Sequence, residues 1–414
     1  MLVGVDVTSI DRVGGLVERY PRFVTRVFTP HEQEASRGKP RRWASSWAAK
    51  EAVRKLYSQG GQPMPAYRDI EVTRRPGRPP GVSVRGAMTS IALSLTHDAG
   101  VAIAVAATDG VGFDGATVAD DLRLAARPDD GHKGTFGRVL VVAGARGYTG
   151  APQLAALGAA RAGAGLVTLC IPESIYAIVA SRCLEVMPAP LPDGGAGVLQ
   201  RDALATLQDR LRTADALVIG PGLGRAAETQ SALMELLAAL PCPAVVDADA
   251  LNLAAAEQFD WRRCEQPVVI TPHPAEMARL MGVETAVVQA DRVAHACGYA
   301  REHGVTVVLK GSESVIASPE ERVHVDDHRV VALATGGTGD VLAGVIGSLC
   351  AQGLDTFDAA VAGVTIHAEA GAMVQRQRGR AGALASDAID ALPQAQERLR
   401  RALERVNRSA SERY

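Results

Sequence analysis

The first hundred residues combine short alternating segments with one long helical pattern. Valines at positions 3, 5 and 7 alternate with Gly4 and Asp6, which predicts a strand that carries Asp6 on the face opposite the valines. Thr29, Pro30 and Glu32 form a helix-start signature with Thr29 as the N-cap. We also expect a helix over 43–56 and a strand over 69–72. Residues 91–97 and 101–105 are expected to form a hairpin.

From residue 138 onward the pattern changes to apolar strands that each end in a glycine or polar loop. Such strands are expected at 138–143, 166–170, 216–219, 244–247, 268–270 and 305–309. Helical segments between them make a series of βαβ units, which is typical of an α/β fold with a mainly parallel sheet. In an open parallel sheet the carboxyl ends of the strands line the ligand crevice. We therefore expect these loops to form a binding site.

The segment 334–344, Ala-Thr-Gly-Gly-Thr-Gly-Asp-Val-Leu-Ala-Gly, runs from a glycine-rich loop straight into an apolar helix. Its glycines leave backbone N–H groups uncovered at a helix N-terminus, which suits a phosphate or a developing oxyanion. Asp340 lies in the first turn, where its charge is also favourable. Either this segment is an anion hole with a catalytic carboxylate, or it is a tight turn with an ordinary helix-start aspartate.

Composition narrows the class of protein. A chain of 414 residues favours two domains, and 47% hydrophobic residues with a net charge of −2 indicate a globular protein. This charge balance argues against a nucleic-acid or membrane partner, and no signal peptide or long apolar run is evident. The 6 cysteines are scattered without a CxxC pair, as expected of reduced thiols, so we expect a cytoplasmic location.

The few lysines are informative because most other basic residues are arginines. They stand at positions 39, 50, 55, 133 and 310. A retained lysine in such a chain indicates a need for a compact point charge. Lys55 also lies four residues after Glu51, and the simpler interpretation of that pair is a solvated helix salt bridge.

Six separated elements resemble the holo-acyl-carrier-protein synthases, which are 4′-phosphopantetheinyl transferases, over residues 1–107. They are Gly4-Val5-Asp6 with Arg12, Phe28-Thr29-Pro30 with Glu32, Trp47-Ala48-Ala49-Lys50-Glu51-Ala52 with Lys55, Asp69-Ile70-Glu71-Val72, Gly77-Arg78-Pro79, and Ser94-Leu95-Thr96-His97. The resemblance implies an α+β domain that moves phosphopantetheine from coenzyme A to a serine of acyl carrier protein. It departs from the family at Ser46, where an arginine is common, and over 57–61.

By this resemblance, Asp6 and Glu51 hold Mg²⁺ against the coenzyme A diphosphate. Lys50, Lys55 and His97 belong to its coenzyme A site, with Lys55 neutralising phosphate charge and His97 near the nucleotide. The resemblance also implies a homo-oligomer with the site between subunits. The alternative is a domain that keeps the oligomer but has lost the transferase activity.

A second series of motifs resembles the ADP-dependent NAD(P)H-hydrate dehydratases, a ribokinase-like family, over residues 114–395. It comprises His132-Lys133-Gly134 with Gly137, Gly144 to Ala151, Gly158 to Gly165, Gly220-Pro221-Gly222-Leu223-Gly224, Asp247-Ala248-Asp249-Ala250-Leu251-Asn252, Thr271-Pro272-His273-Pro274 with Glu276, Lys310-Gly311, Gly337-Thr338-Gly339-Asp340, His367, and Ala385-Ser386-Asp387. The stretch 326–333 departs from the family, which usually has a Gly-Asn-Pro sequence there.

This resemblance implies an α/β/α sandwich that repairs the S epimer of hydrated NADH or NADPH. ADP or ATP phosphorylates the ring hydroxyl, and phosphate then leaves. Asp340 would take the hydroxyl proton, and Glu276 would order Mg²⁺ through water unless it is only a helix-start carboxylate. The implied contacts to the hydrate are Ala151, Gly222, Gly224, His273 and Asp340, and those to the nucleotide are Lys310, Gly311, Ser312, Glu313, Ser314, Gly337, Thr338 and Gly339.

Together these observations predict a bifunctional enzyme with a transferase domain over 1–110, a dehydratase domain over 111–395 and a charged tail over 396–414. Its ligands would be NAD(P)H hydrate, ADP, coenzyme A, acyl carrier protein and Mg²⁺. The alternative for the larger domain is a small-molecule kinase of the same fold, joined to an inactive N-terminal oligomerisation domain.

Overall fold

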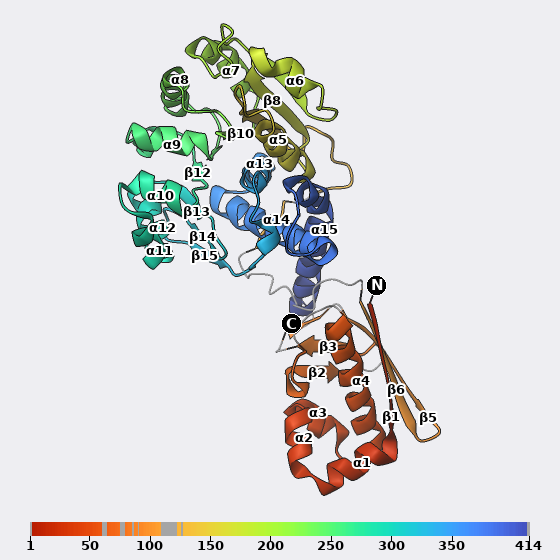
Figure 1. The fold of residues 1–414 in the computed structure, drawn as a ribbon. Coiled ribbons are helices and arrows are strands. Elements are labelled where there is room, and N and C mark those ends of the chain that lie inside the picture. Colours follow the sequence, from red (N-terminus) through yellow and green to blue (C-terminus); the bar gives the residue numbers. More distant parts are fainter. Residues whose placement is uncertain are drawn as a thin grey trace. The chain divides into compact units, whose positions relative to one another are not determined.

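The computed structural model describes residues 2–59, 64–74, 79–84, 87–89, 91–108, 122–125 and 127–411. The chain forms two compact units, Met1–Asp120 and Asp121–Tyr414 (Figure 1). The domain boundary expected near residue 110 and part of the Gly77-Arg78-Pro79 motif lie outside the described residues.

The N-terminal unit packs a long helix, α4 (Pro40–Gln59), against a three-stranded antiparallel sheet (Figure 1). The sheet order is β1 (Leu2–Ser9), β6 (Val101–Thr108), β5 (Ala92–Asp98). A Cβ at Gly4 would lie 2.0 Å from the carbonyl oxygen of Ala52, so only glycine lets β1 approach α4 this closely. The remaining elements are α1 (Ile10–Arg19), α2 (Pro21–Val27), α3 (Pro30–Ser36) and the sheet β2 (Ile70–Thr73), β3 (Gly81–Val84), β4 (Ala87–Met88).

The alternation predicted for the first strand is confirmed, and the structure shows which face is buried. Gly4 and Thr8 of β1 are buried on the side of α4, and Asp6 is half-buried there. The valines at 3, 5 and 7 point away and are exposed, with Val7 57% accessible. The N-terminal unit therefore presents an apolar sheet face to its surroundings.

The predicted helix start at Thr29 is also confirmed. Thr29 Oγ1 accepts a hydrogen bond from the Glu32 N–H, and the Glu32 carboxylate accepts one from the Thr29 N–H. Glu32 then continues into the core, where it accepts from the Val72 N–H at 2.9 Å. This carboxylate thus ties α3 to β2.

The C-terminal unit contains a nine-stranded sheet in the order β15-β14-β13-β12-β11-β10-β7-β8-β9. The seven strands from β13 to β9 run parallel, and β14 and β15 form an antiparallel edge. Their bounds are β7 (Arg138–Val142), β8 (Leu166–Pro172), β9 (Met187–Leu191), β10 (Ala216–Ile219), β11 (Ala244–Val246), β12 (Val268–Ile270), β13 (Thr306–Leu309), β14 (Ser314–Ala317) and β15 (Val323–Asp326). The mainly parallel sheet predicted from the sequence is confirmed.

Helices cover both faces of this sheet (Figure 1). One face carries α5 (Ala151–Arg161), α13 (Thr338–Ala351), α14 (Thr356–Arg378) and α15 (Ala385–Ser411). On the other face, residues of α7 (Leu204–Leu211), α8 (Ala227–Leu237), α9 (Asp249–Ala256), α10 (Pro274–Met281) and α12 (Arg292–His303) share one apolar core with the strands. The helices α6 (Tyr176–Ala180) and α11 (Thr285–Ala290) are short.

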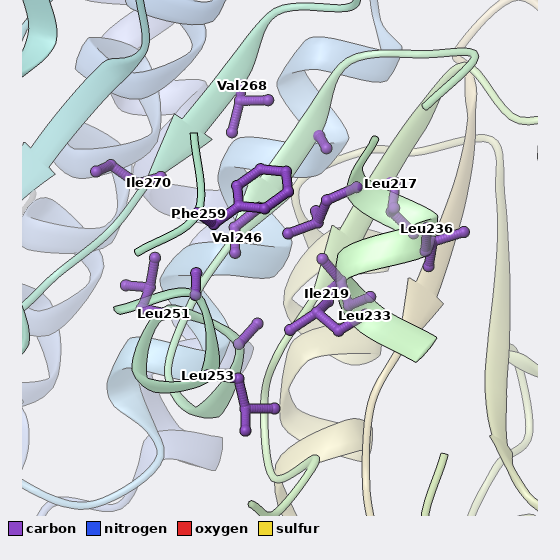
Figure 2. Packing of buried hydrophobic residues seen from close by; sticks show 14 of the residues in the cluster. Leu217, Ile219, Leu233, Leu236, Val246, Leu251, Leu253, Phe259, Val268 and Ile270 are labelled. Carbon is purple, nitrogen blue, oxygen red and sulfur yellow. The ribbon is translucent and has the colours of Figure 1, made fainter. Parts of the chain in front are cut away.

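The core on the second face is built from alternate strand residues. Figure 2 shows Leu217 and Ile219 of β10 beside Leu233 and Leu236 of α8, with Phe259 close to the strands. All of these side chains are nearly or completely buried. This packing keeps the carboxyl ends of the central strands together at one edge of the sheet.

The apolar helix predicted after the glycine loop is α13, whose side chains are almost all buried. It crosses α5 at very short range, because a Cβ at Gly344 would lie 2.0 Å from the Ala155 carbonyl oxygen. The close contact with α5 fixes where the N-terminus of α13 points.

Helix α15 runs without interruption through residue 396, where a separate charged tail was expected, and continues to Ser411. Among the helices of the described chain, none combines the length and the apolar character that a membrane span requires.

Candidate functional site

The main site of the C-terminal unit lies where parallel strands end, as the βαβ pattern predicted. Asp247 directly follows β11, Lys310 directly follows β13, and Asp340 lies in the first turn of α13. The Lys310 Nζ lies 2.7 Å from Asp247 Oδ1, and a Cβ at Gly339 would lie 3.4 Å from this ammonium. The glycine loop, Lys310 and Asp340 therefore converge, although they are far apart in the sequence.

Asp247 anchors this convergence. Its side chain is 1% exposed, and its Oδ1 accepts from both the Lys310 ammonium and the Thr271 hydroxyl, each at 2.7 Å. The Lys310 Nζ is also 4.0 Å from Glu276 Oε2. Burial acts most strongly and would lower the pKa of Lys310, but the charges of Asp247, Glu276 and Asp340, with the Asp247 hydrogen bond, together raise it. Lys310 thus remains a cation beside the loop.

Asp340 has the electrostatics of a general base. Burial, followed by the negative charge of Asp247, raises the pKa of its carboxyl to about 7, while Lys310 acts in the opposite direction. A carboxylate with a pKa near the operating pH can accept a proton and still be ionised often enough to act. The ordinary helix-start interpretation does not require such a shift.

The loop before Asp340 has the conformation that an anion site needs. Gly337 adopts a φ of +90°, and a Cβ there would lie 2.5 Å from Leu154 Cδ1. Thr338 Oγ1 donates to the carbonyl oxygens of Leu333 and Thr335. The side chain of Thr338 therefore holds the turn closed while the backbone N–H groups stay at the helix N-terminus.

Two of the residues expected to contact the hydrate, Ala151 and Gly222, lie next to each other. A Cβ at Gly222 would lie 3.0 Å from the Ala151 Cβ, so the N-terminus of α5 touches the loop after β10. The Gly224 N–H donates to Asp249 Oδ2 at 3.0 Å, which fixes the end of that loop.

His273 is the N-cap of α10, and its environment determines its protonation. Its Nδ1 accepts from the N–H groups of Ala275 and Glu276, so the ring proton is on Nε2. Burial and the nearby Lys310 lower the pKa of the imidazole. His273 is therefore a neutral hydrogen-bond donor whose side chain is about half exposed.

Glu276 completes a capping box with His273, because its Oε2 accepts from the His273 N–H at 2.8 Å. Glu276 therefore does act as a helix-start carboxylate. Glu276 is nonetheless buried beside Lys310, and burial raises the pKa of its carboxyl. Its position near the ammonium leaves it able to act on a ligand as well.

The expected nucleotide loop 310–314 is shaped by a residue that sequence reasoning missed. Arg292 of α12 donates to the carbonyl oxygens of Leu309 and Glu313, which spans the loop. The Ser314 hydroxyl closes it further by donating to the Gly311 carbonyl, while Gly311 and Ser312 are exposed. Nothing in the sequence around Arg292 marks it, since its partners are backbone atoms distant in the chain.

In the N-terminal unit, the expected metal site consists of two carboxylates on facing elements. Asp6 comes from β1 and Glu51 from α4. Lys55 Nζ lies 2.8 Å from Asp6 Oδ1, so this lysine pairs across to the strand rather than only along its helix. Glu51 accepts a hydrogen bond from the Tyr67 hydroxyl, whose pKa burial raises to about 12. Within the described residues no group of three or more metal-binding side chains occurs.

Lys50 does not have the role expected for it. It is completely buried, lies 2.7 Å from Glu32 Oε2, and donates to the carbonyl oxygens of Val27, Tyr67 and Ile70. These acceptors use all the protons of the ammonium. The assignment of Lys50 to coenzyme A binding is therefore wrong, because the charge neutralises Glu32 within the core.

His97 instead lies at a cavity of about 490 Å³ in the same unit. The cavity is lined by Lys39, Arg41, Arg42, Ser45, Arg74, Pro80, Leu95 and His97. Its cationic side chains come from the start of α4 and the end of β2, and His97 comes from β5. An anionic ligand fits such a lining best.

The family models match both units. One described as NAD(P)H-hydrate dehydratase covers residues 139–394, which is more than half of the chain. The chain belongs to the NAD(P)H-hydrate dehydratase family. A second model, of the 4′-phosphopantetheinyl transferase superfamily, covers residues 2–106. The prediction that these two families are joined in one chain is confirmed.

Individual relatives agree with the dehydratase match. The bifunctional NAD(P)H-hydrate repair enzyme Nnr of Moorella thermoacetica is 46% identical over 271 residues, which are 66% of this chain and 51% of that protein. The ADP-dependent (S)-NAD(P)H-hydrate dehydratase of Neisseria meningitidis is 39% identical over 64% of this chain and 86% of its own length. The chain spans about half the length of the bifunctional repair enzymes it matches.

Among solved structures, the ADP/ATP-dependent NAD(P)H-hydrate dehydratase of Bacillus subtilis, co-crystallised with ATP and Mg²⁺, matches with a TM-score of 0.59 and 31% identity. The match covers 67% of this chain and 94% of the Bacillus chain. The ribokinase-like architecture predicted for the C-terminal unit is confirmed.

This dehydratase-family unit has two further histidines near the loop. In the stretch that departs from the family, His328 Nδ1 lies 3.0 Å from both carboxylate oxygens of Asp326, and these hydrogen bonds raise its pKa. His367 of α14 is buried, which lowers its pKa to about 4, and it shares a backbone hydrogen bond with Thr338. His367 therefore lies against the first turn of α13, whereas His328 pairs with Asp326 at the end of β15.

The raised pKa of Asp340 predicts a pH-dependent effect of Asp340→Asn on stability. The folded state holds this proton more tightly than the unfolded state, so stability falls as the pH rises from near 3.8 through about 7. The variant avoids this loss and should be more stable than the parent by about 2–4 kcal/mol at pH 8, with a smaller gain at pH 5. Differential scanning calorimetry at both pH values measures this difference in stability.

The control is Asp209→Asn on the exposed surface of α7, where no pH-dependent gain is expected. An Asp340→Asn gain of equal size at pH 5 and pH 8 would contradict the assigned electrostatics.

Proposed function

We propose that the C-terminal unit dehydrates the S epimer of NAD(P)H hydrate with ADP or ATP as phosphoryl donor. The observation that carries this proposal is the position of Asp340, a carboxyl with a pKa of about 7 in the first turn of α13, next to the glycine loop and Lys310. Phosphoryl transfer depends chiefly on positioning and on charge stabilisation, and these groups supply both. The family match and the Neisseria relative support the substrate.

In the first step, Asp340 takes the proton of the ring hydroxyl as its oxygen attacks the terminal phosphorus of the nucleotide. The N–H groups at Gly337, Thr338 and Gly339 stabilise the charge on the transferring phosphoryl group, and AMP leaves when ADP is the donor. In the second step, the C–O bond at C6 of the ring breaks and phosphate departs, while the neighbouring C5 loses a proton, so that the C=C bond of the dihydronicotinamide ring is restored. The products are NAD(P)H, AMP and phosphate.

The remaining residues divide between the two substrates. Lys310 and the loop through Ser314 would hold the nucleotide phosphates, because Lys310 is the cation kept beside the anion hole. The hydrate would lie against Ala151, Gly222 and Gly224, with the neutral His273 donating from Nε2 to one of its oxygens.

Mg²⁺ fits this site chemically, since buried carboxylate oxygens and nucleotide phosphates are its preferred ligands. Glu276 would order it through water, as the family resemblance implies, and the ion would neutralise phosphate charge. Asp247 is already committed to Lys310 and Thr271.

The dehydratase is tested by absorbance at 340 nm after hydrated NADH is mixed with the protein, ADP and Mg²⁺. We expect a nucleotide-dependent rise that Asp340→Asn lowers by about 100-fold or more, since it removes the general base. The value of kcat/KM should rise with pH around 7 and level off above it, because only the ionised Asp340 accepts a proton. Asp247→Asn should shift this profile to lower pH by removing a negative neighbour.

Asp209→Asn again serves as the control and should keep the parental rate. A stable phosphorylated product, without recovered NADH, would instead identify the alternative, a small-molecule kinase of this fold.

We further propose that the N-terminal unit transfers 4′-phosphopantetheine from coenzyme A to a serine of acyl carrier protein. Asp6 and Glu51 would hold Mg²⁺, since two carboxylates from β1 and α4 plus diphosphate oxygens match its ligand preference. Lys55 forms an ion pair with Asp6 and would neutralise the negative charge of the phosphates. His97 would lie near the nucleotide at the basic cavity. The free state of the 6 cysteines fits the reducing cytoplasm, where both activities would operate.

The transferase is tested by the mass of acyl carrier protein after incubation with the protein, coenzyme A and Mg²⁺. Modification is expected for the parent chain, and Asp6→Asn and Glu51→Gln should each lower the rate by about 100-fold or more through loss of the metal ligand. The matched control is Asp11→Asn on the exposed side of α1. A folded parent without activity would favour the alternative of a retained oligomerisation domain.

We also propose that the chain forms a homo-oligomer through the exposed face of β1 and β6. Val5 pairs with Val105 and Val7 with Ile103, so apolar side chains from both strands share this face. Exposed apolar surfaces of this kind mark protein interfaces. Analytical ultracentrifugation should show an oligomer that Val5→Glu dissociates, and a monomeric parent at micromolar concentration would refute the interface.

A further inference from the structure

The basic cavity of the N-terminal unit is lined by four cations, Lys39, Arg41, Arg42 and Arg74. Among the lining residues that the structure describes, none is acidic. Like charges held this close repel one another unless an anion lies among them. The cavity is therefore an anion site, and one of its cations differs from the rest.

That cation is Arg74, directly after β2. Lys39, Arg41 and Arg42 are exposed at the start of α4, whereas Arg74 is partly buried, and burial lowers the pKa of its guanidinium. Arg74 Nη1 donates to the Ser46 hydroxyl at 3.0 Å. Arg74 Nη2 is buried and has no hydrogen-bond partner among the described residues. A buried donor left without an acceptor destabilises the protein, and a ligand oxygen that accepts from it would remove this cost.

Ser46 explains why the guanidinium can lie there. This residue is completely buried on α4 and its short side chain leaves the space that the Arg74 head group fills. Lys50, one turn further along α4, is not free to bind an anion, because Glu32 and three carbonyl oxygens use its ammonium.

We propose that Arg74, held by Ser46, presents the unpaired nitrogen of its guanidinium to the basic cavity and binds a phosphate group of coenzyme A there. This inference rests on the proposed transferase function. Ser46 is a positioning residue in this arrangement: it holds Nη1 and directs the second nitrogen to the phosphate. A planar guanidinium can donate to the hydroxyl and to the phosphate from two different nitrogens, which an ammonium cannot do.

The test is the affinity of the full-length protein for coenzyme A with Mg²⁺, measured by isothermal titration calorimetry. Arg74→Ala should weaken binding by about 10- to 100-fold, the range expected for a lost charge-assisted hydrogen bond. Arg74→Lys should keep only part of the parental affinity for coenzyme A. The matched control is Arg22→Ala, an exposed arginine of α2, which should bind as the parent does.

A relocation variant sharpens the test. Ser46→Arg combined with Arg74→Ala moves the guanidinium from β2 to α4 and should recover most of the lost affinity. Parental affinity in folded Arg74→Ala would overturn the proposal, and this single variant decides the matter if the double variant does not fold.

Failure of the inference can be separated from failure of the proposed function by a second probe, adenosine 3′,5′-bisphosphate. If the parent binds the bisphosphate but not coenzyme A, and Arg74→Ala weakens that binding, the anion site stands and the transferase function falls. If the folded parent binds neither probe, both are overturned.

Discussion

The ion pair between Asp247 and Lys310 is the interaction on which the C-terminal site depends. It joins the ends of β11 and β13, and Thr271, after β12, donates to the same carboxylate oxygen. A buried carboxylate without this partner would be strongly destabilising, so the three strand ends must stay in register. The pair also sets the charge beside the glycine loop: Lys310 places a cation there, while Asp247, after burial, is the next cause of the raised pKa of Asp340.

The N-terminal unit uses a buried ion pair differently. Lys50 and Glu32 neutralise each other completely inside the core, where they connect α3, α4 and β2. Lys310, in contrast, keeps a side chain that is 20% exposed and faces the site. The same residue type is thus enclosed in the core of one unit and partly accessible in the other, and the packing around it makes this difference.

Several features could be predicted because their signals are local. The capping motif at Thr29, the alternation in β1 and the apolar run of α13 each depend on neighbours within a few residues. The resemblance to the dehydratases also placed Lys310 and Asp340 in one site. Arg292, the Ser46–Arg74 contact and the burial of Lys50 were not predictable in this way, because each depends on backbone or side chains that are distant in the chain.

The sequence by itself determined the two families, the alternation of strands and helices, and which residues are candidates for the chemistry. These follow from periodicity and from motifs whose residues are close together in the chain. Only the tertiary structure decided which charges are free to act. Desolvation and partner charges depend on what packs around each group, so packing made Lys50 structural, His273 a neutral donor and Asp340 a base with a pKa of about 7.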